Sequence, residues 1–301
     1  MKAWVLHAKN DIRLDEVPDP KQKENEMLVK VMAASICSTD YSRVYGTSAY
    51  HYPIILGHEF SVVAQNGERF AVFPLLPCFK CESCQTHRYE TCISYGYLGS
   101  RQDGAFAECI SVPKWNLIRL PDSMTFEQAA LIEPSAVALH AVKRLDFAAT
   151  NSVAVVGNGT IGRIIAKWLS ILGVEKVHII GRNNTTSLKC YDACFEAVGT
   201  AEALSRCIEL VKPNGLLVVV GNPNESFCIE QMLYWQILRK QISVIGSWNS
   251  DYPDDWNETI NNADKLGLND FIDRIIKFNE LGAVFENMRG KSMANGRIII
   301  A

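Results

Sequence analysis

The sequence has no apolar run approaching the roughly 18 consecutive residues that a membrane-spanning helix needs, which argues against a membrane protein. It opens on MKAWVLHAKNDIRLDE, whose apolar stretch is too short for a secretory signal, so we expect no export. It has no excess of basic charge: the formal net charge is −3, which argues against nucleic acid as a partner. It also lacks internal repeats and low-complexity tracts, which excludes a repeat array.

The composition is that of an ordinary globular protein. The chain has 301 residues, of which 48% are apolar and 21% are charged, and this length suits two domains that each have a core. Ten cysteines are many for a protein without an export signal. Because we expect such a protein in a reducing compartment, here the cytoplasm, clustered thiols indicate metal ligands rather than disulfides.

Four cysteines fall in one short loop, CFKCESCQTHRYETC, at Cys78, Cys81, Cys84 and Cys92. Zinc prefers a tetrahedron of soft ligands such as thiolates, and gaps of two residues let a tight turn aim neighbouring sulfurs at one point. Four thiolates form a closed shell that leaves no position for a substrate. The loop therefore predicts a structural zinc, with an iron–sulfur or other redox cluster as the alternative.

A second group of potential metal ligands is spread along the chain. Cys37, His58, Glu59 and Glu133 lie in ASICSTDYSRVYG, YHYPIILGHEF and AALIEPSAVALHAV. A thiolate, an imidazole and a carboxylate would supply three protein ligands and leave the fourth position open, as a catalytic zinc requires. Taken singly, each residue is also compatible with an ordinary position in a core.

Residues 151–173, NSVAVVGNGTIGRIIAKWLSILG, predict a strand, a glycine-rich turn and a helix. A GxGxxG pattern in this setting indicates a dinucleotide site, because its glycines permit a tight turn, a close approach of the pyrophosphate and close packing of helix on strand. The N-terminus of the helix would supply amide donors to the phosphates. The residues expected at the cofactor are Gly157, Gly159, Thr160, Ile161 and Gly162.

The residue at the end of the next expected strand, VEKVHII, indicates which of the two nicotinamide cofactors, NAD or NADP, is bound. A carboxylate there would accept a hydrogen bond from the ribose 2′-hydroxyl of NAD. The chain instead has Gly181 and Arg182, and an arginine can meet the 2′-phosphate of NADP. We therefore expect NAD(P) as the cofactor and favour NADP; a solvated surface arginine is the alternative.

The order of these motifs resembles that of the zinc-dependent medium-chain dehydrogenases, the alcohol dehydrogenase superfamily. Cys37 comes first, followed by Gly57-His58-Glu59, the four-cysteine loop, Glu133 and the GxGxxG turn. Within this superfamily the chain is most similar to the branch of galactitol-1-phosphate and sorbitol (polyol) dehydrogenases. The segments that carry this similarity are HYPIILGHEF, PLLPCFKCESC, GYLGSRQDGAFAE, IEPSAVALHA and ILRKQISVIGSWNS.

The resemblance implies an α/β fold with two domains. A GroES-like, β-rich catalytic domain would occupy residues 1–138 and be completed by residues 270–301. A Rossmann domain with a doubly wound parallel sheet would occupy residues 139–269. Gly221, which follows the expected strand at 216–220, would line the nicotinamide end of this domain or form a plain turn.

The resemblance also implies two zinc ions per chain and roles for several residues. Catalytic zinc would be held by Cys37, His58 and Glu133, with Glu59 as a neighbour that can replace a ligand, and the four-cysteine loop would hold the structural zinc. Thr39 would relay the proton of the alcohol. Asp40 would orient His58 from behind.

The implied reaction is hydride transfer between a secondary alcohol and NAD(P), with a polyol or sugar-alcohol phosphate as substrate. The implied assembly is a homodimer or a homotetramer. Arg101, in YLGSRQDG, is either a phosphate contact or a partner in a loop salt bridge. Two alternatives stay open: a zinc-independent quinone or enone reductase on the same scaffold, and a non-catalytic nucleotide-sensing protein.

Two stretches are shorter than the resemblance implies. Residues 62–70 leave little room for a hairpin, and residues 182–193 replace a helix, a strand and a further helix. Either the domain is shortened there or segments are missing from the sequence. We expect the second, because a Rossmann sheet without its third strand leaves a gap that nothing else in the chain fills.

Overall fold

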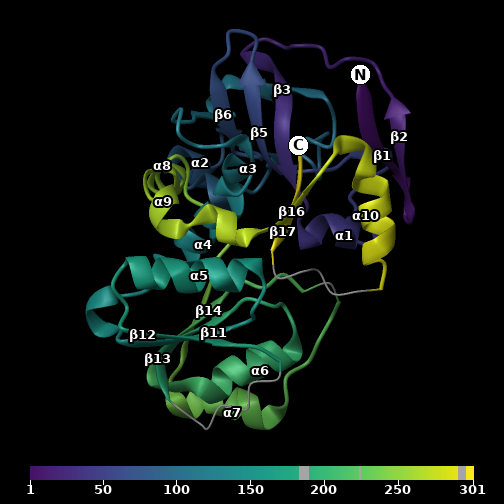
Figure 1. The fold of residues 1–301 in the computed structure, drawn as a ribbon. Coiled ribbons are helices and arrows are strands. Elements are labelled where there is room, and N and C mark those ends of the chain that lie inside the picture. Colours follow the sequence, from purple (N-terminus) through teal and green to yellow (C-terminus); the bar gives the residue numbers. More distant parts are fainter. Residues whose placement is uncertain (183–189, 224, 291–295) are drawn as a thin grey trace. The chain divides into compact units, whose positions relative to one another are not determined.

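The computed structural model describes residues 1–182, 190–223, 225–290 and 296–301. The chain divides into two compact units, which Figure 1 shows. Unit 1 comprises Met1–Pro134, Asp251–Asn261 and Gly267–Ala301, and unit 2 comprises Ser135–Ser250 and Asn262–Leu266. Within the described residues, no helix has the length and apolar character that crossing a membrane requires.

Unit 1 consists mostly of strands. They are β1 (Lys2–Ala8), β2 (Asp11–Glu16), β3 (Glu26–Ser35), β4 (Ile54–Ile55), β5 (Glu59–Ala64), β6 (Arg69–Val72), β7 (Leu75–Leu76), β8 (Gly96–Tyr97), β9 (Cys109–Pro113), β10 (Leu117–Arg119), β16 (Ile272–Ile276) and β17 (Arg297–Ile300). Its helices are α1 (Ser38–Tyr45), α2 (Glu82–Gln85), α3 (Phe126–Ala129), α8 (Asp254–Asn261) and α10 (Leu281–Met288), and α4 (Ile132–Val142) begins here and continues in unit 2. Short 3-10 helices lie at Tyr89–Thr91, Lys114–Asn116, Leu268–Phe271 and Phe278–Glu280.

The largest sheet of unit 1 is built around β3. Its strands follow the order β10-β6-β5-β3-β17-β16, and β9 also pairs with β3. The β-branched and aromatic side chains of β5 and β17 suit a half-buried pleated surface, and they pack into a core with Leu6 and Phe106. β17 runs antiparallel to β3, with Ile299 opposite Ser35, so the segment near residue 300 lies beside the segment that leads to Cys37.

An aromatic cluster explains why the structure groups residues 251–261 with unit 1. The ring of Tyr252 stacks on Phe73 at 4.4 Å, and Trp256 meets the same ring edge-on at 5.5 Å. The Tyr252 hydroxyl also donates to the carbonyl of Trp115. Such contacts join positions far apart in the sequence, so composition alone gives no sign of them; the boundaries expected from the sequence stay predictions.

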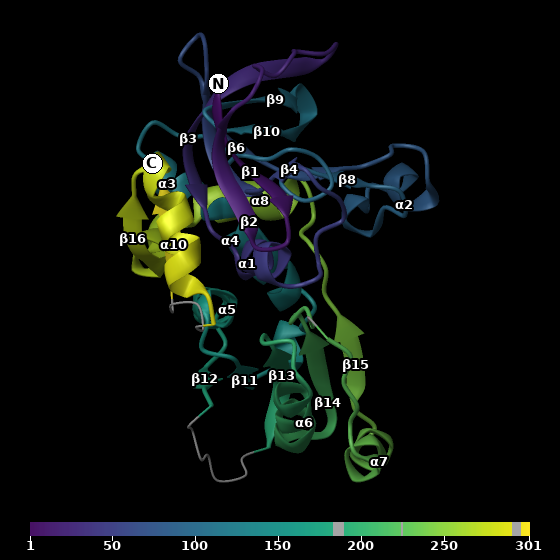
Figure 2. The same cartoon turned by 90° about the vertical axis from the view of Figure 1, so that its right-hand side faces the viewer.

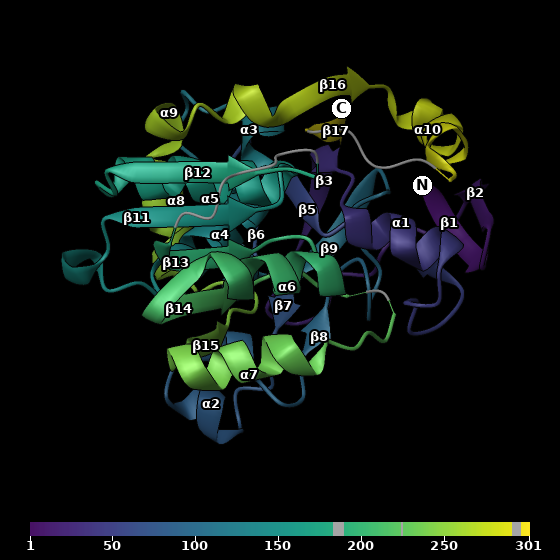
Figure 3. The ribbon, with the colours of Figure 1, turned by 90° about the horizontal axis from the view of Figure 1, so that it is seen from below.

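Unit 2 contains an all-parallel sheet covered by helices on both faces. Its strands are β11 (Ser152–Val156), β12 (Lys176–Ile180), β13 (Tyr191–Glu196), β14 (Val211–Val219) and β15 (Ser243–Gly246), and its helices include α5 (Thr160–Ile171), α6 (Ala201–Leu210), α7 (Gln231–Lys240) and α9 (Ala263–Leu266), with a 3-10 helix at Phe147–Ala149. The strand order is β12-β11-β13-β14-β15. α5 covers one face, and α6 and α7 cover the other (Figures 1 and 3).

Of the two stretches expected to be too short, the structure describes residues 62–70 in full and residues 182–193 only in part. The first closes as a tight hairpin between β5 and β6, where the amide of Ala64 donates to the carbonyl of Glu68 at 2.8 Å, so two strands do fit there. In the second, β12 and β13 pair with β11 on opposite sides, and β12 is an edge of the sheet in the described chain (Figure 2). Residues 183–189 between them lie outside the described residues.

Candidate active site

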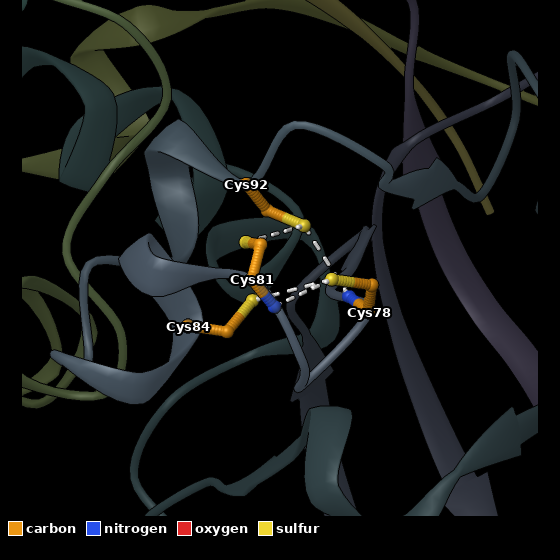
Figure 4. A group of neighbouring side chains, drawn as sticks. All are labelled: Cys78, Cys81, Cys84 and Cys92. Atoms are coloured by element: carbon orange, nitrogen blue, oxygen red, sulfur yellow. Dashed lines mark hydrogen bonds between the residues drawn. The ribbon is translucent and has the colours of Figure 1, made fainter.

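The four-cysteine loop brings its sulfurs together. The ligand atoms of Cys78, Cys81, Cys84 and Cys92 all lie within 4.8 Å of one another, and Figure 4 shows them converging. The Cys78–Cys84 and Cys81–Cys92 sulfur distances are both 3.9 Å, far longer than the ~2.05 Å of a disulfide. All four are free thiols.

The backbone of this loop favours thiolates. The amides of Cys84 and Ile93 donate to the Cys81 sulfur and lower the pKa of Cys81 to about 6. Burial, together with hydrogen bonds to Cys81 and Cys92, raises the pKa of the neighbouring Cys84 to about 12, so this thiol keeps its proton unless a cation is bound. A closed four-thiolate set of this kind fits a structural zinc ion, which would supply that cation.

A second metal-competent group forms where β3, α1 and β5 meet. Cys37 immediately precedes α1, His58 immediately precedes β5, and Glu59 is the first residue of β5. All three side chains are buried, and their ligand atoms lie within 4.8 Å of one another. The structure thus gathers residues separated by about twenty positions in the sequence into one set of sulfur, nitrogen and oxygen donors.

Asp40 holds this group from behind. Its carboxylate lies 3.3 Å from Nδ1 of His58 and accepts the amide of Cys37 at 3.0 Å. Burial opposes a charged histidine, but Asp40 and Cys37 outweigh burial and raise the pKa of His58 well above its ordinary value. With Nδ1 facing Asp40, the other ring nitrogen of His58 is the one available to a metal.

Arg297, which the sequence did not point to, is the counter-charge of the group. Its Nη2 donates to Glu59 Oε1 at 2.6 Å and to the Cys37 sulfur at 3.5 Å. Burial works against a thiolate, yet Arg297 and His58 together lower the pKa of Cys37. The only sequence signal was a charged residue at the start of the otherwise apolar strand RIII.

Glu133 lies next to this group rather than in it. The sequence-based ligand set was Cys37, His58 and Glu133, whereas the three residues that the structure brings within 4.8 Å include Glu59 instead. Glu133, in the first turn of α4, is buried, and its Oε1 accepts a hydrogen bond from the Tyr97 hydroxyl at 3.1 Å. Burial raises the pKa of Glu133, and the charges of His58 and Cys37 are close enough to act on it.

Thr39 lies beside the group, in the first turn of α1. Its Oγ1 accepts a hydrogen bond from Arg43 at 3.1 Å, and the same arginine nitrogen lies 3.4 Å from Asp40. Arg43, also missed in the sequence, therefore connects the hydroxyl expected to relay a proton with the carboxylate that holds His58.

The glycine turn of unit 2 has the shape that a dinucleotide needs. Gly157 has φ +124°, where a side chain would be strained, and a Cβ on Gly162 would lie 2.0 Å from the Gly157 carbonyl oxygen. A Cβ on Gly159 would meet nothing within 4 Å in the described chain. Protein packing therefore accounts for two of the glycines, and Gly159 leaves an open space that fits an approaching phosphate.

The remaining residues expected at the cofactor lie around this turn. Thr160 and Ile161 begin α5, with Gly159 at its N-cap. Arg182 is exposed just beyond the end of β12, and the neighbouring Gly181 faces Asn158 of the glycine turn. Gly221 packs against Gly199, since a Cβ there would lie 2.1 Å from the Gly199 nitrogen, so its small size serves backbone packing.

Comparison with known proteins gives consistent matches. Family models described as alcohol dehydrogenase GroES-like domain and as zinc-binding dehydrogenase match residues 23–122 and 183–265. The chain is 31% identical to galactitol 1-phosphate 5-dehydrogenase of Escherichia coli strain K12, over 85% of each protein. It is 30% identical to sorbitol dehydrogenase of Bacillus subtilis strain 168, over 75% of this chain and 76% of that protein.

The fold agrees with a solved structure of the same kind. The crystal structure of galactitol-1-phosphate dehydrogenase from Escherichia coli matches with a TM-score of 0.91 and 28% identity, over 100% of this chain and 99% of that chain. These findings confirm the resemblance read from the motifs and the α/β fold with a GroES-like and a Rossmann-like part.

Two glycine variants separate cofactor binding from packing. We expect Gly159→Ala to lower the free energy of unfolding by less than about 1 kcal/mol, because alanine is only a poorer N-cap there. It should raise the Kd of NADH and of NADPH about tenfold or more, because the methyl group fills the open space. Gly162→Ala should instead destabilise the protein by about 1–3 kcal/mol through its clash with Gly157. Urea unfolding measures the stability of each variant, and a fluorescence titration with NADH and NADPH measures cofactor affinity. Unchanged affinity for both cofactors in Gly159→Ala would contradict the assignment of the glycine turn.

Proposed function

Because this chain belongs to the zinc-binding alcohol dehydrogenase family, we propose that it oxidises a secondary hydroxyl of a polyol or sugar-alcohol phosphate with NAD(P). It is an oxidoreductase with polyol dehydrogenase relatives. The observation that carries the proposal is the buried group of Cys37, His58 and Glu59, with Glu133 beside it. A zinc-independent reductase or a nucleotide sensor would have no use for such a donor set.

We propose that Cys37 and His58 hold the catalytic zinc and that a carboxylate completes the set. Glu59 is the carboxylate within the group, and Glu133 is the neighbour that can take its place. Cys78, Cys81, Cys84 and Cys92 would hold the structural zinc. Bound zinc supplies a Lewis acid that lowers the pKa of the substrate hydroxyl, and bound NAD(P) supplies the hydride acceptor.

The protein's own residues would position and deprotonate the substrate. Arg43 occupies one lone pair of the Thr39 oxygen, which orients this hydroxyl and leaves it able to accept the substrate proton and pass it on. Asp40 fixes the ring of His58 and Arg297 fixes Glu59, so the groups around the reacting hydroxyl are held before substrate arrives. Asp40, His58, Glu59 and Arg297 are buried, so little water would reach the substrate hydroxyl from their side.

We propose NADP as the preferred cofactor and a reducing compartment, the cytoplasm, as the place of action. The support for NADP is Arg182, an exposed cation just beyond the end of β12. The residue before it, Gly181, faces Asn158 of the glycine turn. The support for the compartment is that all ten cysteines are free. The division into units supports unit 1 as the catalytic domain and unit 2 as the dinucleotide domain.

We propose that two copies associate through α7 and β15. Met232, Tyr234 and Leu238 of α7 are each more than half exposed, and Val244 of β15 is 49% exposed. In the described chain β15 pairs only with β14, and its residues SVIG include neither a charge nor a proline that would block pairing with another strand. A second copy can cover this face and pair the two edges around a two-fold axis.

A variant that lacks one proposed zinc ligand should lose the zinc of that group and keep the other zinc. We expect two zinc ions per wild-type chain, and one in Cys37→Ser, with turnover lowered at least about a hundredfold and the fold retained. Cys84→Ser should also keep one zinc but lose thermal stability, because it opens the closed shell. Metal analysis, circular dichroism and polyol oxidation measure these effects. Exposed Cys190→Ser is the control, and full turnover in Cys37→Ser would contradict the proposal.

Removing the cation at Arg182 should change the choice of cofactor. We expect Arg182→Ala to raise the KM for NADP about tenfold to a hundredfold, the cost of losing a charge-assisted hydrogen bond to phosphate, and to leave the KM for NAD unchanged. Steady-state kinetics with each cofactor measure the difference. A wild-type enzyme that prefers NAD, or equal effects on both cofactors, would be inconsistent with NADP recognition by Arg182.

Placing a charge on the exposed edge should separate the copies. We expect the wild-type protein to sediment as a dimer or a larger oligomer, and Val244→Lys to shift it toward monomer, because the lysine blocks edge-to-edge pairing. Glu175→Lys, an exposed change next to the opposite edge of the sheet, is the matched control. Sedimentation velocity gives the result, and an unshifted Val244→Lys would place the interface elsewhere.

A further inference from the structure

Arg101 is held rigidly in the turn that follows β8. Its guanidinium carbon lies 4.2 Å from the ring centroid of Tyr95 and 4.5 Å from that of Tyr50. Nη1 donates to the Tyr95 carbonyl at 3.2 Å, and His51 reaches the Arg101 carbonyl at 3.3 Å. Nη2 also donates to the Tyr50 hydroxyl at 3.5 Å, so each of the two terminal nitrogens keeps one further N–H group for a ligand.

The charge of Arg101 has no carboxylate partner in the described part of the chain. Two arginines beside the metal group are neutralised, Arg43 by Asp40 at 3.4 Å and Arg297 by Glu59 at 2.6 Å. The acid nearest to Arg101 in sequence, Asp103, instead accepts the amide of Ile55 at 3.0 Å. A partly buried cation without a counter-ion favours the binding of an anion.

A chain of ring contacts connects Arg101 to the metal group. The Tyr95 ring that it contacts lies 6.3 Å from Tyr97, and the Tyr97 ring lies 5.9 Å from His58. Tyr97 also donates to Glu133. The segment that carries Tyr50 and His51 leads directly to His58, so both segments around Arg101 are connected to the metal group, and all these residues belong to unit 1.

We propose that Arg101 binds a terminal anionic group of the substrate, and that the enzyme therefore prefers a polyol phosphate to the neutral polyol. This inference rests on the proposed function. An anion site apart from the metal group is what such a substrate needs: in galactitol 1-phosphate, the substrate in the name of one relative, the phosphate is on carbon 1 and the reacting carbon is carbon 5. A phosphate presents three acceptor oxygens to the guanidinium fork, and a carboxylate of a sugar acid presents two.

The test compares substrates that share one carbon skeleton. The zinc-loaded holoenzyme is assayed with galactitol 1-phosphate, galactonate and galactitol, in the wild type and in Arg101→Gln, Arg101→Lys and the exposed control Arg88→Gln. We expect the wild type to have its highest kcat/KM with the phosphate. Arg101→Gln should lower that value about tenfold to a hundredfold and change the value for galactitol less than about twofold. Arg101→Lys should retain part of the preference, and Arg88→Gln should retain all of it.

The outcomes separate this proposal from the function on which it rests. Equal losses with galactitol 1-phosphate and galactitol in Arg101→Gln, or no preference in the wild type, would overturn the role of Arg101. A preference for galactonate that depends on Arg101 would support the anion site but identify a carboxylate. If the wild type oxidised none of the three, the proposed function would fail. Calorimetric titration of galactitol 1-phosphate into the wild type and Arg101→Gln would then still decide whether Arg101 binds the anion, and melting temperatures verify that each variant folds.

Discussion

The site depends on how unit 1 compensates the charges that it buries. Five ionisable side chains are buried there. Three can carry a negative charge (Glu59, Asp40 and the thiol of Cys37), and two can carry a positive charge (His58 and Arg297). An unpaired charge in such surroundings would be strongly destabilising, so each side chain must have a partner. Arg297 satisfies Glu59 and Cys37, and Asp40 satisfies His58. This compensation keeps the Cys37 sulfur and the His58 ring close together in a buried place, where a cation that binds both would displace their protons.

Local spacing made much of the molecule predictable. The four cysteines act within one loop, so their gaps alone indicated that the sulfurs converge, and the structure brings them together. The glycine turn likewise combines a strand, a turn and a helix in consecutive residues, and β11 and α5 occupy that segment. In both cases the physical cause lies within about twenty residues, where sequence patterns are informative.

The parts that escaped prediction depend on contacts between distant segments. Arg297 and Glu59 are 238 positions apart, and their pairing follows from the register of β17 on β3. No sequence motif indicates this register. Tyr97 reads as an ordinary aromatic residue until the fold places its hydroxyl against Glu133. The hydrogen bond from Tyr97 and the ion pair of Arg297 distribute the two carboxylates around the metal group, and this is why Glu59 lies within the group and Glu133 at its side.

The pairing of residue 297 with residue 59 also affects the order of events during synthesis on the ribosome. Cys37, His58 and Glu59 emerge long before Arg297, and contacts of such large sequence separation form late in folding. While only residues 1–296 have been synthesised, the group of Cys37, His58 and Glu59 therefore lacks Arg297, the partner of the Glu59 carboxylate. The four-thiol loop needs no distant partner and is complete as soon as it is made. The two candidate metal sites of one polypeptide would thus become ready for metal at different times, the four-cysteine loop first and the group of Cys37, His58 and Glu59 only in the nearly finished chain.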